Sequence, residues 1–280
     1  MNNMSSSSEK IGLALGGGFA RGIAHAGVLQ VFERYRIPIH CIAGVSAGSI
    51  VATAYSSGAT TDAIARAGAS MRFRDVAQWT LSAMGFARSS RMESFLRRLL
   101  KQFRFEDMRI PLGVVATDLG TGNPVIFRDH GDVNLAVRAS CSYPGLFTPV
   151  NDGARLLVDG GISMEIPAEV CRSMGATRVI SVNLPSPAWK QTGANVFNVV
   201  NRCIQIVQAR TNQAWRETSD VVIAPDVQTV SWNGFGSADA MIRAGEQATL
   251  AVLPEILSWI RPTPSHVDHE RDLGDLVKAA

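Results

Sequence analysis

The 280-residue sequence lacks the long uncharged apolar run, of about 18 residues or more, that a membrane-spanning helix needs. Residues 1–9 are polar and rich in serine, and they lack the apolar segment of a secretory signal. The sequence therefore predicts neither a transmembrane helix nor an export signal. We expect a cytoplasmic protein in which residues 1–9 form a flexible N-terminus.

Cysteine and net charge are also low. The four cysteines, at positions 41, 141, 171 and 203, are far apart and form no Cys-x-x-Cys pair. This spacing indicates buried, reduced side chains rather than a disulfide framework. The net charge of +3 argues against a nucleic-acid-binding protein. With 46% hydrophobic and 18% charged residues, the composition is that of an ordinary globular protein.

Short apolar segments alternate with longer segments of helical periodicity. We expect strands at residues 10–16, 39–45, 112–117, 124–127, 155–158, 177–183 and 220–224. We expect helices at residues 20–36 and 47–57, from Thr60, from Ser90, at 133–140, near 195–215 and at 237–260. This order predicts a three-layer α/β/α fold with a mostly parallel central sheet. A single domain would cover residues 10–261, followed by a loose C-terminal tail at 262–280.

Three small-residue segments directly follow predicted strands, at Gly16, Ser46 and Asp159. In an open parallel sheet, right-handed connections place the loops after the strands at one edge, where ligands bind. We therefore expect these three segments to meet at one site.

Ser46 lies in the segment Gly44-Val45-Ser46-Ala47-Gly48, which has the G-x-S-x-G pattern of a nucleophile elbow. In such an elbow a strand turns sharply into a helix and exposes the serine oxygen. Gly44 and Gly48 would let the strand and the helix approach without a side-chain collision. The pattern alone also arises by chance, so the interpretation depends on its combination with the other two segments.

A glycine loop precedes the elbow, in Gly16-Gly17-Gly18-Phe19-Ala20-Arg21-Gly22. It matches G-x-G-x-x-G in neither register, and no Gly-Lys-Ser/Thr follows, so it is neither a dinucleotide nor a Walker loop. Backbone N–H groups of such a loop at a helix start can stabilise an oxyanion. We predict this role for the loop, with Arg21 supporting it.

The serine needs a base, because a free hydroxyl is a poor nucleophile at neutral pH. The five histidines lie inside a predicted helix, before the elbow strand, in a turn or in the tail: His25, His40, His130, His266 and His269. Asp159 is the better candidate, since Gly160 and Gly161 leave room for close approach and burial would raise its pKa. Asp-Gly is also common in turns, so a purely structural role for Asp159 is the alternative.

Together, the segments at residues 15–22, 42–49, 138–149 and 157–161 resemble the patatin-like phospholipase family. The similarity runs from about residue 11 to 184, and more weakly to about 260. It looks closest to bacterial patatin-like proteins and to the catalytic domain of neuropathy target esterase. The resemblance implies a patatin-like fold.

The resemblance also implies a dyad of Ser46 as nucleophile and Asp159 as general base. It implies an oxyanion hole from the N–H groups of three loop residues (Gly17, Gly18 and Phe19). Phe19 departs from many members, which have a further glycine there, and a positive φ would strain it. The implied reaction is hydrolysis of acyl esters of phospholipids or lysophospholipids through an acyl-enzyme, with no metal or cofactor.

Residues 71–109 contain nine basic and four acidic residues, with apolar side chains such as Trp79 and Phe86 among them. We interpret this segment as a mobile cap that meets anionic headgroups, which would place the protein peripherally at the inner membrane face. The alternative is a solvated helix pair with a buried apolar face.

Two further functions remain open at this point. An acyltransferase could use the same serine, although similar transferases use a Ser–His pair and no histidine lies in a suitable loop. A non-catalytic regulatory or interaction protein could retain the fold, although the serine, the aspartate and the loop are all present.

Overall fold

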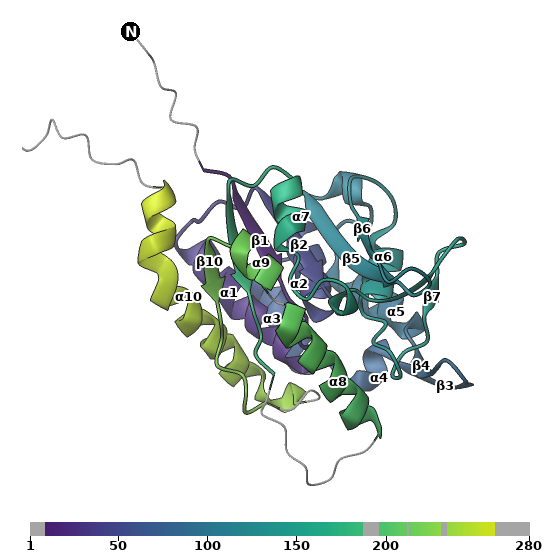
Figure 1. Ribbon diagram of the computed structural model, residues 1–280. Helices are drawn as coiled ribbons and strands as arrows, with labels where there is room; N and C mark the ends of the chain where they lie inside the picture. Colours follow the sequence, from purple (N-terminus) through teal and green to yellow (C-terminus); the bar gives the residue numbers. More distant parts are fainter. Residues whose placement is uncertain (1–8, 187–195, 212, 231–233, 261–280) are drawn as a thin grey trace, which may run out of the picture.

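A mixed sheet forms the centre of the molecule (Figure 1), described here by a computed structural model for residues 9–186, 196–211, 213–230 and 234–260. Eight strands within these residues join in the order β10-β9-β1-β2-β5-β8-β7, and β6 also pairs with β5. Their bounds are β1 Ile11–Leu15, β2 Cys41–Val45, β5 Leu112–Asp118, β6 Pro124–Phe127, β7 Val150–Asn151, β8 Leu156–Asp159, β9 Arg178–Val182 and β10 Val221–Ile223.

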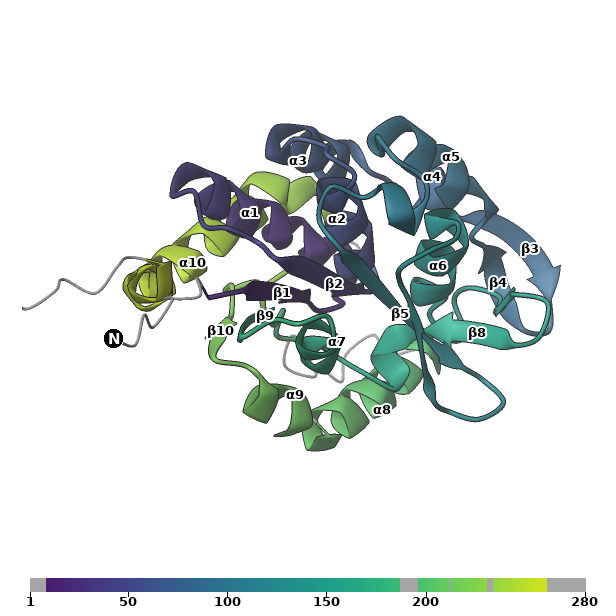
Figure 2. The ribbon, with the colours of Figure 1, turned by 90° about the horizontal axis from the view of Figure 1, so that it is seen from above.

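Helices cover both faces of the sheet, which gives the three-layer α/β/α fold predicted from the sequence (Figure 2). One face carries α1 Ala24–Arg34, α2 Ala47–Ser56, α3 Thr61–Ser70, α5 Ser90–Leu99, α6 Val133–Ser140 and α10 Ala238–Ile260. The other carries α7 Ala168–Ser173, α8 Val196–Thr211 and α9 Gln213–Thr218. The remaining helical segments are short: the α-helix α4 Phe73–Val76 and the 3-10 helices η1 Phe19–Ile23, η2 Phe105–Asp107, η3 Gly160–Ile162 and η4 Phe235–Ser237.

The strands are buried on both faces, and their side chains alternate between two cores. In β1, Leu13 and Leu15 enter the core under α1 and α10, whereas Ala14 enters the core under α7 and α9. Trp215 of α9 closes the second core. This double burial explains why the strand segments read as continuous apolar runs in the sequence.

Five strands, β10, β9, β1, β2 and β5, run parallel, as predicted. Our expectation that Asp159 follows a strand of the same direction is wrong, because β8 runs antiparallel to β5. On β5, Val115 pairs with Val45 of β2 and with β6, whereas Ala116 pairs with Asp159 of β8 and with β6. Because β6 pairs along one edge of β5, β2 and β8 both pair along the other edge. They run in opposite directions there, and their C-terminal ends meet.

Most other predicted elements lie within a few residues of the observed ones, but the helix expected near 195–215 is divided into α8 and α9, and α7 and β7 were not predicted. Two further differences concern the N-terminal helix. The expected helix at 20–36 divides into the 3-10 turn η1 and α1, and it ends two residues early. The helix expected from Thr60 is α3, and the Thr60 side chain accepts a hydrogen bond from the N–H of Ala63, as an N-cap does. The predicted N-terminus at 1–9, except for Glu9, and the tail at 262–280 lie outside the described residues.

Residues 71–109 do not form the helix pair that was the alternative interpretation of this segment. Between α4 and α5 lies an antiparallel hairpin of β3 Gln78–Ser82 and β4 Gly85–Arg88. The N–H groups of Phe86 and Ala87 both donate to the carbonyl of Leu146, and the N–H of Thr148 donates to Ala87. These hydrogen bonds hold β4 against residues 146–148. Because neighbouring side chains of a strand point to opposite faces, Phe86 faces outward.

The structure tests two expectations from the composition, on membrane-spanning helices and on the cysteines. In the part of the chain that the structure describes, no helix is both long and apolar enough to cross a bilayer. All four cysteines are free, and Cys41, Cys141 and Cys171 are buried as expected. Cys203 on α8 is exposed, contrary to our prediction for the set.

Helices α1 and α10 lie in direct backbone contact, side by side in both ribbon views (Figures 1 and 2). A Cβ on Gly27 would collide with the carbonyl oxygen of Ile242, and a Cβ on Gly245 would collide with that of Ala24. These two glycines therefore set the distance between the helices.

We expect Gly245→Ala to lower the free energy of unfolding by about 2 kcal/mol, because the added methyl group forces the helices apart. Alanine favours a helix interior over glycine by about 1 kcal/mol, so a loss of stability would identify packing as the cause. Urea denaturation measures this difference. Gly236→Ala is the control, since its Cβ would meet nothing within 4 Å; an equal change in both variants would contradict the prediction.

Candidate active site

Ser46 lies between β2 and α2 with a backbone φ of 52° and ψ of −126°. A positive φ is uncommon for a residue other than glycine, and it persists only where the surrounding structure holds it. Two hydrogen bonds hold this turn: the Ser46 N–H donates to Ser140 Oγ at 2.8 Å, and Ser49 Oγ donates to the Ser46 carbonyl at 2.6 Å. The segment thus has the backbone form of a nucleophile elbow.

The glycines around the elbow are required by close backbone contacts. A Cβ on Gly44 would lie 2.6 Å from the Gly48 carbonyl oxygen, and a Cβ on Gly48 would collide with the carbonyl oxygen of Leu15. A Cβ on Gly17 would lie 3.2 Å from Ser46 Cβ, so the glycine loop passes directly over the serine. These glycines therefore support the elbow by leaving room for close backbone contacts.

Asp159 reaches Ser46 from the opposite direction, at the point where β8 meets β2. Its N–H donates to the carbonyl of Ser142 at 3.0 Å, and its own carbonyl accepts a hydrogen bond from Thr117 at 2.9 Å. A Cβ on Gly160 would collide with the carbonyl oxygen of Val115, which explains the glycine after the aspartate. The backbone on both sides thus fixes the carboxyl group.

The Asp159 carboxyl group is buried, with 2% of the residue exposed. Its Oδ1 accepts a hydrogen bond from the Gly161 N–H at 2.9 Å, and this bond caps η3. Asp159 therefore also has the structural role in a turn that was the alternative interpretation. Among the described residues, Oδ2 has no hydrogen-bond partner. Burial raises the pKa of Asp159 to about 7, while the Ser46 hydroxyl and the Gly161 N–H oppose the rise.

The predicted oxyanion residues Gly17, Gly18 and Phe19 line the same cavity as Ser46 and Asp159. Phe19 has a positive φ of 51°, so the anticipated strain is present. Its ring packs edge to face against Tyr143, with centroids 4.8 Å apart. The strained residue thus packs against the wall of the cavity that Tyr143 forms.

Arg21 supports the glycine loop from beneath it. The side chain is buried and donates to the Gly18 carbonyl at 3.3 Å and to the Pro185 carbonyl at 2.6 Å. Burial lowers the pKa of Arg21 to about 10, so the guanidinium remains charged at neutral pH. Both contacts hold loop backbone in place.

His25 is a residue whose part in the site our sequence interpretation missed. It is fully buried, and its Nε2 donates to the carbonyl of Gly16 at 2.9 Å. Burial lowers its pKa to about 4, so the ring is neutral. The sequence did offer one indication that His25 is buried, because His25 lies on the same face of the N-terminal helix as the core residues Val28 and Phe32. The other described histidines, His40 and His130, lie outside the residues that line the cavity.

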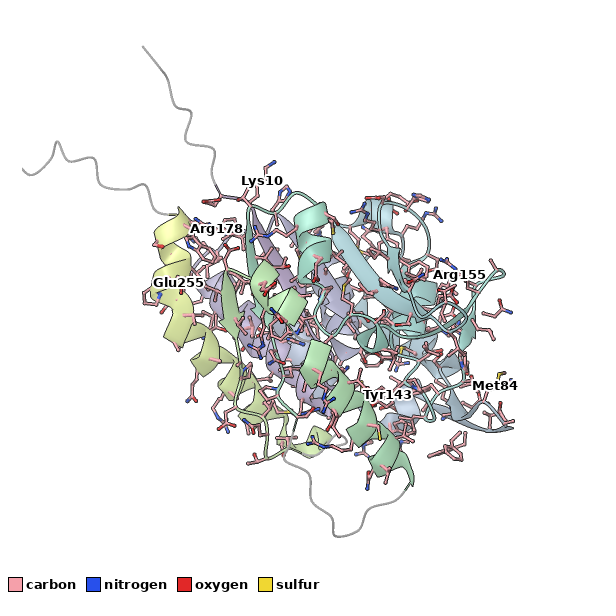
Figure 3. All side chains as sticks on the ribbon, in the orientation of Figure 1. Lys10, Met84, Tyr143, Arg155, Arg178 and Glu255 are labelled. Carbon is pink, nitrogen blue, oxygen red and sulfur yellow. The ribbon has the colours of Figure 1, made fainter. Side chains whose placement is uncertain are left out.

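The segment at 138–149 contributes two further contacts that the sequence did not assign. Ser140 accepts the hydrogen bond from the elbow, and Tyr143 forms one wall of the cavity. The Tyr143 hydroxyl donates to Asn201 of α8 at 2.7 Å, which joins the two sides of the site; Figure 3 places Tyr143 beside α8.

These groups surround a cavity of about 600 Å³. Its floor is the glycine loop with Ser46 and Asp159, and one wall is the polar side of α8 with Asn198, Asn201, Gln205 and Gln208. Gln208 Nε2 also donates to the Gly161 carbonyl at 2.7 Å, so α8 is tied to the turn after Asp159. No cluster of three metal-ligating side chains occurs among the described residues.

Comparison with known proteins identifies the family of this chain. A sequence profile described as "Patatin-like phospholipase" matches residues 13–172. An "uncharacterized NTE family protein" of Mycobacterium tuberculosis is 29% identical over 272 residues, covering 88% of this chain and 46% of that protein. "Lysophospholipase NTE1" of Cryptococcus neoformans is 35% identical over 186 residues, covering 64% of this chain and 11% of that protein.

Among solved structures, VipD from Legionella pneumophila matches with a TM-score of 0.61 and 14% identity, over 89% of this chain and 67% of that one. This similarity concerns the fold alone. The molecule is thus an α/β protein with a serine elbow beside a buried carboxylate. The chain belongs to the patatin-like phospholipase family, and it spans about half the length or less of the curated relatives it matches.

The raised pKa of Asp159 has a consequence for stability. Since the folded pKa of about 7 exceeds the ordinary 3.8, the folded state favours the protonated acid. This stabilisation is complete below about pH 3.8 and is lost as pH rises through 7. At pH 8.5 the buried carboxylate lowers the free energy of unfolding by about 4 kcal/mol relative to the protonated acid. This value takes about 1.4 kcal/mol for each unit by which the pKa is raised.

We therefore expect Asp159→Asn to raise the free energy of unfolding at pH 8.5 by about 2 to 4 kcal/mol and to change it much less at pH 5. Urea denaturation at both pH values measures the difference. Equal effects at pH 5 and 8.5 would show that this carboxyl group does not titrate with a raised pKa.

Proposed function

We propose that the protein is a serine hydrolase that cleaves fatty-acyl ester bonds of phospholipids or lysophospholipids. The observation that carries this proposal is the pairing of the strained Ser46 elbow with a buried carboxylate whose pKa is about 7. A base with a pKa near neutrality can accept a proton in the reaction and still be ionised in a large fraction of molecules. Membership of the family supports the substrate class.

In the first step, Ser46 Oγ attacks the ester carbonyl carbon, and its proton passes to Asp159. Oδ2 is the oxygen available for this proton, because Oδ1 accepts the Gly161 N–H. Backbone N–H groups of Gly17, Gly18 and Phe19 would stabilise the oxyanion, with Arg21 and His25 holding the loop. The intermediate then collapses, the alcohol leaves with the proton from Asp159, and an acyl-enzyme forms.

In the second step, a water molecule gives its proton to Asp159 and attacks the acyl carbonyl. The fatty acid leaves as Ser46 regains a proton from Asp159. One carboxyl group thus acts first as a base and then as an acid in each step, as microscopic reversibility requires. The glycines Gly44, Gly48, Gly160 and Gly161 support this geometry by permitting the close contacts described above.

The polar wall of the cavity supports a substrate with a polar headgroup. Amide side chains of α8 and the guanidinium of Arg202 line this wall. Amides and guanidinium groups are suited to phosphate and hydroxyl oxygens. We therefore place the glycerol and headgroup portion of the lipid against α8.

The hairpin between α4 and α5 is the proposed membrane contact, which refines the cap expected at residues 71–109. Trp79, Met84 and Phe86 are 70%, 58% and 63% exposed, and Met84 projects at the far end of the hairpin in Figure 3. Basic residues flank the hairpin in the sequence. An exposed tryptophan beside cations is suited to the interface of an anionic bilayer.

We expect Ser46→Ala and Asp159→Ala each to lower kcat/KM for short p-nitrophenyl esters and lysophospholipids by about 10³-fold or more, because each removes one half of the dyad. Ser186→Ala, a serine elsewhere in the cavity, is the control and should retain activity. For the unchanged protein, kcat/KM should rise with pH through about 7, as Asp159 loses its proton. Full activity of Asp159→Ala would refute the assigned base.

For membrane contact, we expect the double variant Trp79→Ser, Phe86→Ser to bind anionic liposomes at least fivefold more weakly, since the apolar hairpin surface is lost. Co-sedimentation at low and high salt measures binding. Tyr35→Ser is the matched control, with a 42% exposed aromatic residue at the end of α1. Binding that depends on neither the hairpin nor salt would contradict this contact.

A further inference from the structure

Helix α8 has the reverse of the usual orientation of a surface helix. Such a helix normally buries its apolar side and exposes its polar side. In α8, four amide side chains line the catalytic cavity, whereas four aliphatic side chains are exposed. The amides are those of Asn198, Asn201, Gln205 and Gln208. The exposed aliphatic residues are Val199, Val200, Ile206 and Val207, with exposed fractions between 40% and 57%.

The four exposed aliphatic residues form one continuous strip along α8. Residues seven positions apart lie on the same side of an α-helix, so Val199 and Val200 are aligned with Ile206 and Val207. Cys203, which is also exposed, lies midway between the two pairs. At 1.5 Å per residue the strip is about 12 Å long. Figure 2 shows α8 at the outside of its layer. Apolar side chains that are gathered in this way, rather than scattered singly, indicate a surface that binds a partner.

The inward side of α8 is fixed by contacts with the candidate active site. The Tyr143 hydroxyl donates to Asn201 Oδ1 at 2.7 Å, and Gln208 Nε2 donates to the Gly161 carbonyl at 2.7 Å. Between these two points, Ile204 packs against the apolar cluster to which β4 contributes. A rotation of α8 that buried the aliphatic strip would break these contacts. The strip is therefore the outer surface of a wall of the catalytic cavity, on a helix that packs against the same cluster as the hairpin.

Charge and size point to an anionic lipid surface as the partner. Helix α8 contains no aspartate or glutamate, and its two charged side chains are Arg202 and Arg210. A helix with an apolar side and only positive charges is suited to the interface of an anionic bilayer. A stable protein dimer buries about 800 Å² on each subunit, which is more than four partly exposed aliphatic side chains provide. A fluid bilayer surrounds each inserted side chain without a shape-matched partner surface.

We propose that this strip of α8 is a docking surface for an anionic lipid bilayer. The proposal goes beyond the contact assigned to the hairpin, since it places a wall of the catalytic cavity itself on the bilayer. It rests on the proposed function only in that the bilayer would supply the lipid substrate, and binding itself requires no reaction. Burial of the strip in lipid and attraction of the two arginines to anionic headgroups would provide the free energy of binding.

Cys203 offers a probe at the centre of the strip, because Cys41, Cys141 and Cys171 are buried and do not compete for a thiol reagent. The protein labelled at Cys203 with the polarity-sensitive dye acrylodan is mixed with vesicles of phosphatidylglycerol and phosphatidylcholine. We expect the emission maximum to move to shorter wavelength as the dye enters the bilayer. The shift should decrease at high salt and with vesicles of phosphatidylcholine alone.

The matched control carries the same dye outside the strip and the hairpin. In the variant Cys203→Ser, Ile126→Cys the dye is attached to β6, at a position where the isoleucine is 42% exposed. This control should show no shift with the same vesicles, because β6 is not part of the proposed docking surface.

Substitutions in the strip test the same contact without a dye. Val199→Ser, Ile206→Ser should weaken binding to these vesicles at least tenfold in co-sedimentation, because two apolar side chains lose their burial in lipid. Ile126→Ser, Leu250→Ser is the control pair, with 42% and 38% exposed side chains on β6 and α10, and should bind as the unchanged protein does. Both double variants should retain hydrolysis of p-nitrophenyl acetate, since neither pair lines the catalytic cavity.

Equal vesicle binding by the two double variants, or equal dye signals at positions 203 and 126, would overturn the proposal. A shift at Cys203 that appears without vesicles as protein concentration rises, together with dimers in sedimentation velocity, would also overturn it, because a second copy would then cover the strip. Failure of the proposed function gives a different result. In that case no ester hydrolysis depends on Ser46, while vesicle binding through the strip is unaffected.

Discussion

The site depends on the convergence of β2 and β8 on the same flank of β5. Because β5 is longer than β2, it leaves room for a second strand to pair beyond Val115, and β8 fills that room from the opposite direction. The chain must turn at the junction, and there it places Ser46 and Asp159 face to face. Backbone pairing therefore positions the serine and the carboxylate, without a flexible loop between them.

This arrangement stores free energy at the site. Ser46 and Phe19 both have positive φ angles, and a carboxyl group is buried with one oxygen lacking a hydrogen-bond partner among the described residues. Each of these features costs stability by itself. The dense packing around them, with glycines at the backbone contacts and His25 beneath the loop, holds them in place. The same burial that costs stability brings the pKa of Asp159 near neutrality.

The catalytic cavity and the exposed hairpin lie close together in the structure. The polar wall of α8 lines the catalytic cavity, and Phe19 lines both that cavity and a small apolar cavity under α2, α3 and α5. The exposed hairpin packs on the segment that carries Tyr143, so membrane contact and cavity share one apolar cluster.

The sequence by itself determined the local features of this protein. The elbow, the glycine loop and the alternation of strands and helices follow from short-range patterns of glycine and apolar residues, and the family resemblance follows from the same segments. Only the tertiary structure decided the direction of β8, the hairpin at 78–88, the contact of His25 with Gly16 and the two cavities that meet at Phe19. The physical reason is that these features depend on pairing and packing between segments far apart in the chain, which local periodicity does not encode.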